Sequence, residues 1–136
     1  MALSRDDILG LSDIQTKEIE VPVWDSTVYI RQLTRGQQDE FMRRKFGNAS
    51  IKGFGKKSEI DTNLTLFGHD TWVAAQGICD ENGKRLFSNS DIEKLSERNG
   101  EAIGFIATEI LEFSGMVKDI ETLEEVLETE QEEVKN

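Results

Sequence analysis

The chain has 136 residues, a mass of 15.4 kDa and a formal net charge of −11, which leaves room for one domain with a single modest core. No apolar stretch approaches the roughly 20 residues that a membrane-spanning helix needs, and the first residues carry acids where a signal peptide carries bases. An acidic chain is also poorly suited to a phosphate backbone, because binding there requires many neutralised phosphates. We therefore expect a cytoplasmic protein that binds neither a membrane nor nucleic acid.

The charge is unevenly distributed along the chain. Residues 117–136 contain eight acids and two bases, a net charge of −6 that leaves −5 for the remainder. Residues 43–57 contain six bases and no acid. Segments of such opposite charge would attract each other between neighbouring copies of the chain.

Residues 1–17 are expected to form a flexible N-terminal arm that orders on binding. Its possible anchors are four apolar residues, Ile8, Leu9, Leu11 and Ile14.

A β-hairpin is predicted directly after this arm. Apolar residues alternate with polar ones on both sides of a turn at Asp25 and Ser26, namely Ile19, Val21 and Val23 before it and Val28 and Ile30 after it. Pro22 donates no ladder hydrogen bond, which places the first strand at a sheet edge. Trp24 lies at the turn, where it either covers the first helix or remains exposed as a contact, and we favour the first.

The next element is a capped helix. Thr34 and Gln37 stand at capping-box spacing, which predicts a helix that begins at Arg35. Two acid-to-base pairs follow at i, i+4 spacing, Asp39 with Arg43 and Glu40 with Arg44.

Residues 48–63 are rich in Gly, Ser, Asn and Lys and are expected to form a mobile basic loop. Phe54 stands there between two glycines that offer little to bury it, so a partner could cover it. The segment Gly53–Ser58 superficially resembles a phosphate-binding loop, but position 50 is Ser where the first Gly is needed and position 57 is Lys where Ser or Thr is needed.

Residues 64–79 are predicted to form a mostly buried strand, although their alanines would also suit a helix. The prediction depends on the alternation of Trp72, Ala74, Gln76 and Ile78 with Val73, Ala75, Gly77 and Cys79. Trp72 is assigned to the core, and Cys79 is expected to be a small buried hydrophobe. Asp80–Gly83 has turn chemistry, after which Lys84–Phe87 returns towards the core.

Two further helices follow in the second half of the chain. Ser90 and Glu93 are at capping-box spacing, which predicts a short helix to about Arg98 that buries Ile92 and Leu95. A central core helix is predicted over 101–113, where apolar residues recur at helical spacing: Ile103, Ile106, Ile110 and Phe113, widened by Ala102, Phe105 and Leu111.

Residues 117–136 are predicted to form an acidic amphipathic tail, helical or disordered. Met116, Ile120, Leu123 and Leu127 make a stripe with spacings of four, three and four, and the glutamates fall off it. The stripe has two explanations. It docks onto the body of the same chain, or it captures a partner helix.

No residue pattern predicts catalysis, a metal site or a cofactor. His69 and Cys79 are ten residues apart with no motif around either, and no nucleophile elbow places a Ser beside His69. Asp80–Asp91 resembles a calcium loop, but its Gly comes at the fourth position instead of the sixth. We expect a non-catalytic protein; the alternative from another class is a small enzyme that uses carboxylates around Asp80 and Asp91.

These elements together predict an α+β fold. A small antiparallel sheet, made of the N-terminal hairpin plus a central strand or hairpin, packs against about three helices in a single domain over residues 18–116, and the acidic tail follows. The residues proposed to bind a partner are Trp24, Phe54, Met116, Ile120, Leu123 and Leu127.

The order of these pieces resembles the tail assembly chaperones of long-tailed, siphovirus-type bacteriophages and prophages. The resemblance is carried by residues 8–41, by DENGKRLFSNSDIEKL at 80–95 and by AIGFIATEILEFSGM at 102–116. It implies a non-catalytic protein that binds and solubilises the tape measure protein during tail tube morphogenesis and is absent from the finished virion. It also implies self-association, either on the partner or, as our hypothesis, through the tail against basic loops of neighbouring copies. A frameshifted longer form that recruits the tail tube protein is implied as well. The alternative is a structural head-tail connector or tail-completion protein that stays in the virion.

Overall fold

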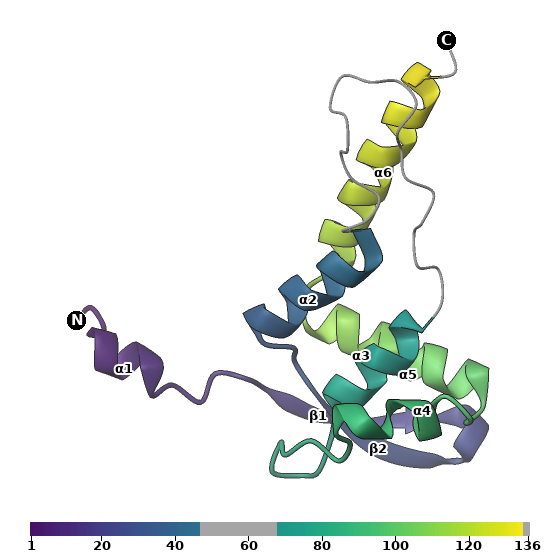
Figure 1. Ribbon diagram of the computed structural model, residues 1–136. Coiled ribbons are helices and arrows are strands. Elements are labelled where there is room, and N and C mark those ends of the chain that lie inside the picture. Colours follow the sequence, from purple (N-terminus) through teal and green to yellow (C-terminus); the bar gives the residue numbers. More distant parts are fainter. Residues whose placement is uncertain (47–67, 135–136) are drawn as a thin grey trace.

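The computed structural model describes residues 1–46 and 68–134, with side chains described as far as Thr129. Figure 1 shows a helical and stranded body from which a short N-terminal arm projects on one side and a long C-terminal helix on another. The elements in chain order are α1 (Arg5–Leu9), β1 (Thr16–Val21), the 3-10 helix η1 (Pro22–Trp24), β2 (Ser26–Arg31), α2 (Arg35–Phe46), α3 (His69–Gly77), β3 (Ile78–Cys79), the 3-10 helix η2 (Asn89–Asp91), α4 (Ile92–Leu95), α5 (Gly100–Phe113) and α6 (Val117–Val134). The predicted α+β class is confirmed.

The sheet has the strand order β1-β2-β3, and both pairings are antiparallel. The hairpin register runs from Thr16 opposite Arg31 to Val21 opposite Ser26, and Asp25 takes the left-handed conformation (φ 49°) that closes the turn. The predicted hairpin and the edge position of its first strand are confirmed. Val23, however, lies in the 3-10 helix that Pro22 begins and not in the strand.

Helix α2 begins at Arg35, as its capping box predicts. The Thr34 backbone N–H donates to Gln37 Oε1 at 2.9 Å, and the Gln37 N–H donates to Thr34 Oγ1 at 3.2 Å. The predicted Glu40–Arg44 pair forms at 3.0 Å. The predicted Asp39–Arg43 pair is wrong, because Arg43 reaches Glu40 instead.

The strand predicted over residues 64–79 is wrong for most of its described length. Residues 69–77 form helix α3, only Ile78 and Cys79 form a strand, and residues 64–67 lie outside the described part. Every residue from Trp72 to Gly77 is buried. A helical segment that is buried on all sides has no polar face, so its sequence shows no helical period of polar and apolar residues. The alternation therefore carried no information about the backbone, although the core positions of Trp72 and Cys79 are confirmed.

The turn and the short helix predicted after β3 both form, but the helix cap lies two residues earlier than predicted. The carboxylate Oδ1 of Asp80 accepts the backbone N–H groups of Asn82 at 2.8 Å and Lys84 at 3.0 Å, which confirms the predicted turn. The predicted capping box at Ser90 and Glu93 is wrong. The cap is formed two residues earlier, by Ser88 and Asp91, because a turn of 3-10 helix precedes α4.

Helix α5 is the centre of the core and contacts α3, β1 and β2. Its buried side chains are those of Ala102, Ile103, Ile106, Ala107 and Ile110. Phe113 is half-buried, while Phe105, predicted to be in the core, is 36% exposed, so that assignment is wrong. The buried stripe on α5 is therefore narrower than the sequence predicted, because Phe105 lies outside it.

Candidate partner-binding surfaces

The first turns of α6 belong to the core of the protein. Met116, just before the helix, is 2% exposed and Ile120 is 9% exposed, and both join the same cluster as α5. Lys45 at the end of α2 adds a polar link, since its Nζ lies 3.3 Å from Glu124 Oε1 on α6. For these two apolar residues the structure therefore supports docking onto the same chain, and in this arrangement a partner has no access to them.

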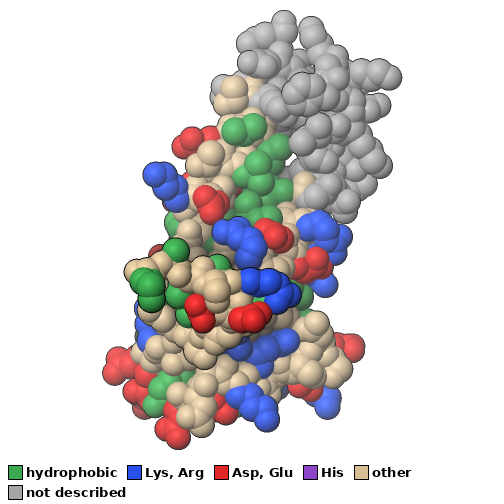
Figure 2. Space-filling view, turned by 90° about the vertical axis from the view of Figure 1, so that its left-hand side faces the viewer, with side chains coloured by type: hydrophobic (Ala, Val, Ile, Leu, Met, Phe, Trp, Pro, Cys, Tyr) green, Lys and Arg blue, Asp and Glu red, His purple; other side chains and the backbone are tan. Residues whose placement is uncertain are grey.

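The apolar stripe of α6 continues beyond Ile120, where its side chains pack only partly against the core. Leu123 and Leu127 are half-buried, and Val126 is 48% exposed. The glutamates between them, Glu121, Glu124, Glu125 and Glu128, are exposed. Figure 2 shows hydrophobic side chains following α6 away from the body. This half of α6 is an acidic helix with an apolar strip that its own body covers only in part.

A second apolar surface surrounds Trp24, which is half-buried. It is an open groove of about 360 Å³ between η1 and α4, and most of its lining area is apolar. Trp24, Leu86, Phe87 and Leu95 supply that apolar lining, and Lys94 and Arg98 stand beside them. Trp24 thus packs on the core with one part of its ring and lines a surface groove with another.

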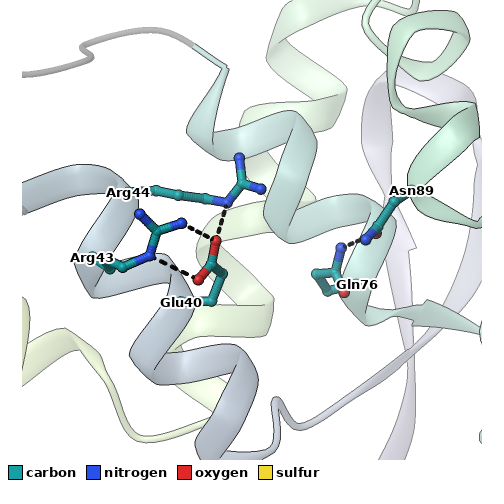
Figure 3. Close-up of polar contacts among 5 residues, drawn as sticks. All are labelled: Glu40, Arg43, Arg44, Gln76 and Asn89. Atoms are coloured by element: carbon teal, nitrogen blue, oxygen red, sulfur yellow. Dashed lines mark hydrogen bonds and ion pairs between the residues drawn. The ribbon is translucent and has the colours of Figure 1, made fainter.

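A buried amide network joins three elements of the body. Gln76 on α3, only 3% exposed, accepts from Gln37 Nε2 at 3.1 Å and donates to Asn89 Oδ1 at 2.7 Å. Arg85 donates to the same Asn89 oxygen and to the Ala75 carbonyl. The network therefore links α2, α3 and η2, and Figure 3 shows the Gln76–Asn89 bond that joins α3 to η2.

On the other side of Figure 3, Glu40 receives hydrogen bonds from Arg43 at 2.6 Å and from Arg44 at 3.0 Å. The hydrogen bond from Arg43 lowers the pKa of Glu40 below its ordinary value, so this carboxylate stays charged near neutral pH. Arg44 also lies over the Trp72 ring, with its guanidinium carbon 5.2 Å from the ring centroid. Arg44 thus links α2 to α3, and Glu40 holds this arginine from within α2.

Residues 9–135 match a protein family described as phage tail assembly chaperone. This match spans nearly the whole chain. The chain belongs to the phage tail assembly chaperone family. The family resemblance inferred from the sequence is therefore confirmed.

Among solved structures, this chaperone resembles the tail assembly chaperone of bacteriophage HK97. The likeness has a TM-score of 0.52 and 18% sequence identity, and it covers 74% of this chain and 85% of that chain. At this identity it supports a shared fold. No curated protein matches the chain.

His69 and Cys79, which sequence reasoning considered as metal ligands, lie at opposite ends of the segment formed by α3 and β3. Burial raises the pKa of the Cys79 thiol above its ordinary value, which keeps the sulfur protonated and unreactive. Burial also lowers the pKa of His69, which begins α3 beside the Phe41 ring.

Among the described residues, no three His, Cys, Asp or Glu side chains are grouped to hold a metal ion. Nor does any described helix have the length and apolar composition for a bilayer crossing.

Of the six residues predicted to bind a partner, the structure brings four into one stripe: Met116, Ile120, Leu123 and Leu127. Trp24 lies apart from them in the groove, and Phe54 lies outside the described residues. Sequence reasoning missed Val126, which lies beside the stripe, and Leu86, which is 56% exposed. The segment Lys84–Phe87 held a signal for Leu86, since only one of two adjacent apolar residues, here the half-buried Phe87, can face the core in an extended segment.

Proposed function

We propose that this tail assembly chaperone binds the tape measure protein and keeps it soluble while the tail tube is built. The half of α6 that lies beyond Ile120 is the proposed contact. A tape measure is a long helical protein, and the resemblance implies that it is the protein such chaperones coat. One apolar strip bordered by glutamates can cover a strip on a partner helix and add negative charge around it.

The observation that carries this proposal is the change in burial along α6. Met116 and Ile120 are buried, whereas Leu123 and Leu127, the next two members of the same stripe, are only half-buried. If the helix existed only to complete the core, the stripe would be buried along its whole length. Instead it continues for about two more turns, through Leu127, with its leucines only half-buried and exposed acids beside it.

Binding of this kind needs no covalent chemistry, in keeping with the non-enzymatic role of a chaperone. The protein would act in the cytoplasm of the host and leave before the virion is complete.

A frameshifted longer form would bring the tail tube protein to the same complex. The codons at the end of the reading frame would reveal whether such a frameshift can occur. In the alternative role, as a head-tail connector or tail-completion protein, the chain would remain in purified virions and mass spectrometry would detect it.

The test is co-expression of the tape measure protein with two matched variants of the chaperone. Leu127→Asp places a carboxylate on the apolar stripe, and Thr129→Asp adds the same charge about 200° further round the same helix. We expect L127D to leave most of the tape measure protein insoluble and T129D to behave as wild type. Equal solubility with both variants, each shown by circular dichroism to be folded, would remove α6 as the contact.

A further inference from the structure

Two arginines project from the face of the sheet that lies opposite the core. Ile30 and Ile78 pair across β2 and β3 and are buried in the core cluster. Because side chains alternate along a strand, Arg31 and Cys79 belong to the other face. Arg85 forms a β-bridge with Cys79, and directly opposite residues share a face, so Arg85 belongs to that face too.

Each guanidinium group is held by a backbone carbonyl near β3. Arg31 Nη1 donates to the Gly83 carbonyl at 3.1 Å. Arg85 donates through Nε and Nη2 to the Ala75 carbonyl, at 3.2 and 3.1 Å, and its Nη2 also donates to Asn89 Oδ1. These bonds fix the orientation of both planar groups. They leave both positive charges in place, because the accepting oxygens carry no formal charge.

No acid compensates these two charges. Neither arginine forms a salt bridge within the segments that the structure describes. Asp80, in the turn after β3, uses its carboxylate to accept backbone N–H groups of its own turn. Burial lowers the pKa of Arg85, and the positive charge of Arg31 lowers it further. The two guanidinium groups are therefore close enough to repel each other, and an anion between them would remove that cost.

The free donors of the pair lie on one edge of Arg31 and on Arg85. Arg31 Nε is buried and has no hydrogen-bond partner in the described part of the chain. Arg31 Nη2 and Arg85 Nη1 also donate no hydrogen bond there, and neither atom is buried. Nε and Nη2 together form a guanidinium edge whose spacing matches two oxygens of a carboxylate or a phosphate. An orphaned buried donor on that edge marks a place for an acceptor.

We propose that Arg31 and Arg85 form a binding site for an oxyanion, a carboxylate or a phosphate group. The anion accepts hydrogen bonds from the free edge of Arg31 and from Arg85 Nη1, and it neutralises the repulsion between the two groups. A pair of arginines is too few for a nucleic acid, whose binding needs many neutralised phosphates. The oxyanion is either free in solution or carried by an acidic segment of a partner protein. Neither arginine belongs to α6, so the site is independent of the proposed tape measure contact.

The test follows the arginine Nε–H signals of the full, isotope-labelled chain by NMR while sodium phosphate is added. Sodium chloride at the same ionic strength is the reference. We expect saturable shifts at Arg31 and Arg85. Arg43 and Arg44 should not shift, because their Nε groups already donate to the Glu40 carboxylate. A second titration uses a short polyglutamate peptide. Tighter binding of the peptide would identify an acidic protein segment as the source of the oxyanion, and tighter binding of phosphate would identify a free anion.

Two variants separate the site from a general effect of charge. Arg31→Gln keeps an N–H donor for the Gly83 carbonyl but removes the charge and the free edge, so it should weaken binding at least about tenfold. Arg31→Lys keeps the charge without the two-donor edge and should also bind more weakly than wild type. Arg5→Gln, which removes the same charge from the exposed N-terminal helix, should bind as wild type does.

Three results would overturn the proposal. The first is the absence of a saturable shift with either probe. The second is a chloride titration that moves the Arg31 and Arg85 signals as far as phosphate does. The third is unchanged affinity in R31Q, shown by circular dichroism to be folded.

Discussion

Replacing Gly77 with Ala should destabilise the chaperone, although the same change usually stabilises a helix. Gly77 ends α3 where it meets α5, the two helices that form much of the core. A Cβ at this position would lie 2.5 Å from Ile110 Cδ1 and 2.8 Å from both Cγ1 and Cγ2. Because three atoms of one buried isoleucine are involved, no single rotation of its end removes the clash, and the helices must move apart.

The expected cost is the balance of two effects. Overpacking of this kind costs about 1–3 kcal/mol, and the better helix propensity of Ala returns at most about 1 kcal/mol. We expect Gly77→Ala to lower the free energy of unfolding by about 1–2 kcal/mol, which corresponds to a fall in Tm of roughly 4 °C or more for a chain of this size. Thermal unfolding followed by circular dichroism measures it.

Gly104→Ala is the matched control, because Gly104 lies within α5 and a Cβ there would meet nothing closer than Asp70 Oδ2 at 3.6 Å. It should raise stability by up to about 1 kcal/mol. Ile110→Val, which removes the nearest atom, should cost less in the Gly77→Ala background than alone, as a double-mutant cycle would reveal. A Gly77→Ala protein as stable as wild type would refute the close packing of α3 on α5.

Three further changes probe other parts of the structure. Gln76→Leu should lower stability by about 1–3 kcal/mol, seen as a lower urea midpoint, because Gln37 Nε2 loses its acceptor on Gln76 and Asn89 Oδ1 loses one of its donors; an unchanged midpoint would count against the network. Hydrogen bonds from the Ser88 backbone N–H and from its hydroxyl lower the pKa of Asp91, so its charge stabilises the fold above the unfolded pKa of about 4 and loses this effect as the pH falls further. Asp91→Asn should therefore be less stable than wild type at pH 7, with a gap that closes in acid; a gap independent of pH would contradict this. Cys79 should react with a thiol reagent only when the protein unfolds, and rapid labelling of the native protein would show that the thiol is accessible.

The elements that the sequence predicted correctly are those with a polar face or a local cap. In the hairpin, exposed glutamates alternate with covered apolar residues over residues 18–21 of β1, α2 has the Thr34–Gln37 capping box, and α5 and α6 have apolar stripes next to charged ones. In each case one side of the element faces water, so polar and apolar residues recur along the sequence with the period of that element. The failure at α3 has the opposite cause, since burial on all sides removes that period.

The candidate surfaces were predictable only where they are continuous in sequence. The stripe of α6 could be found from its spacing, but the depth to which it docks depends on α2 and α5, which meet it only after folding. The groove joins Trp24 to Leu86 and Leu95, more than sixty residues away, so no local pattern could show it. The Gln76 network is hidden for the same reason.

The most direct test of the proposed contact places a photo-crosslinking amino acid at Val126 during phage tail assembly. A second variant with the same residue at Glu101, exposed near the start of α5, is the control. Irradiation should join the Val126 variant to the tape measure protein and leave the Glu101 variant unlinked. Crosslinks from Val126 to other copies of the chaperone alone would contradict the claim that the outer half of α6 holds the tape measure.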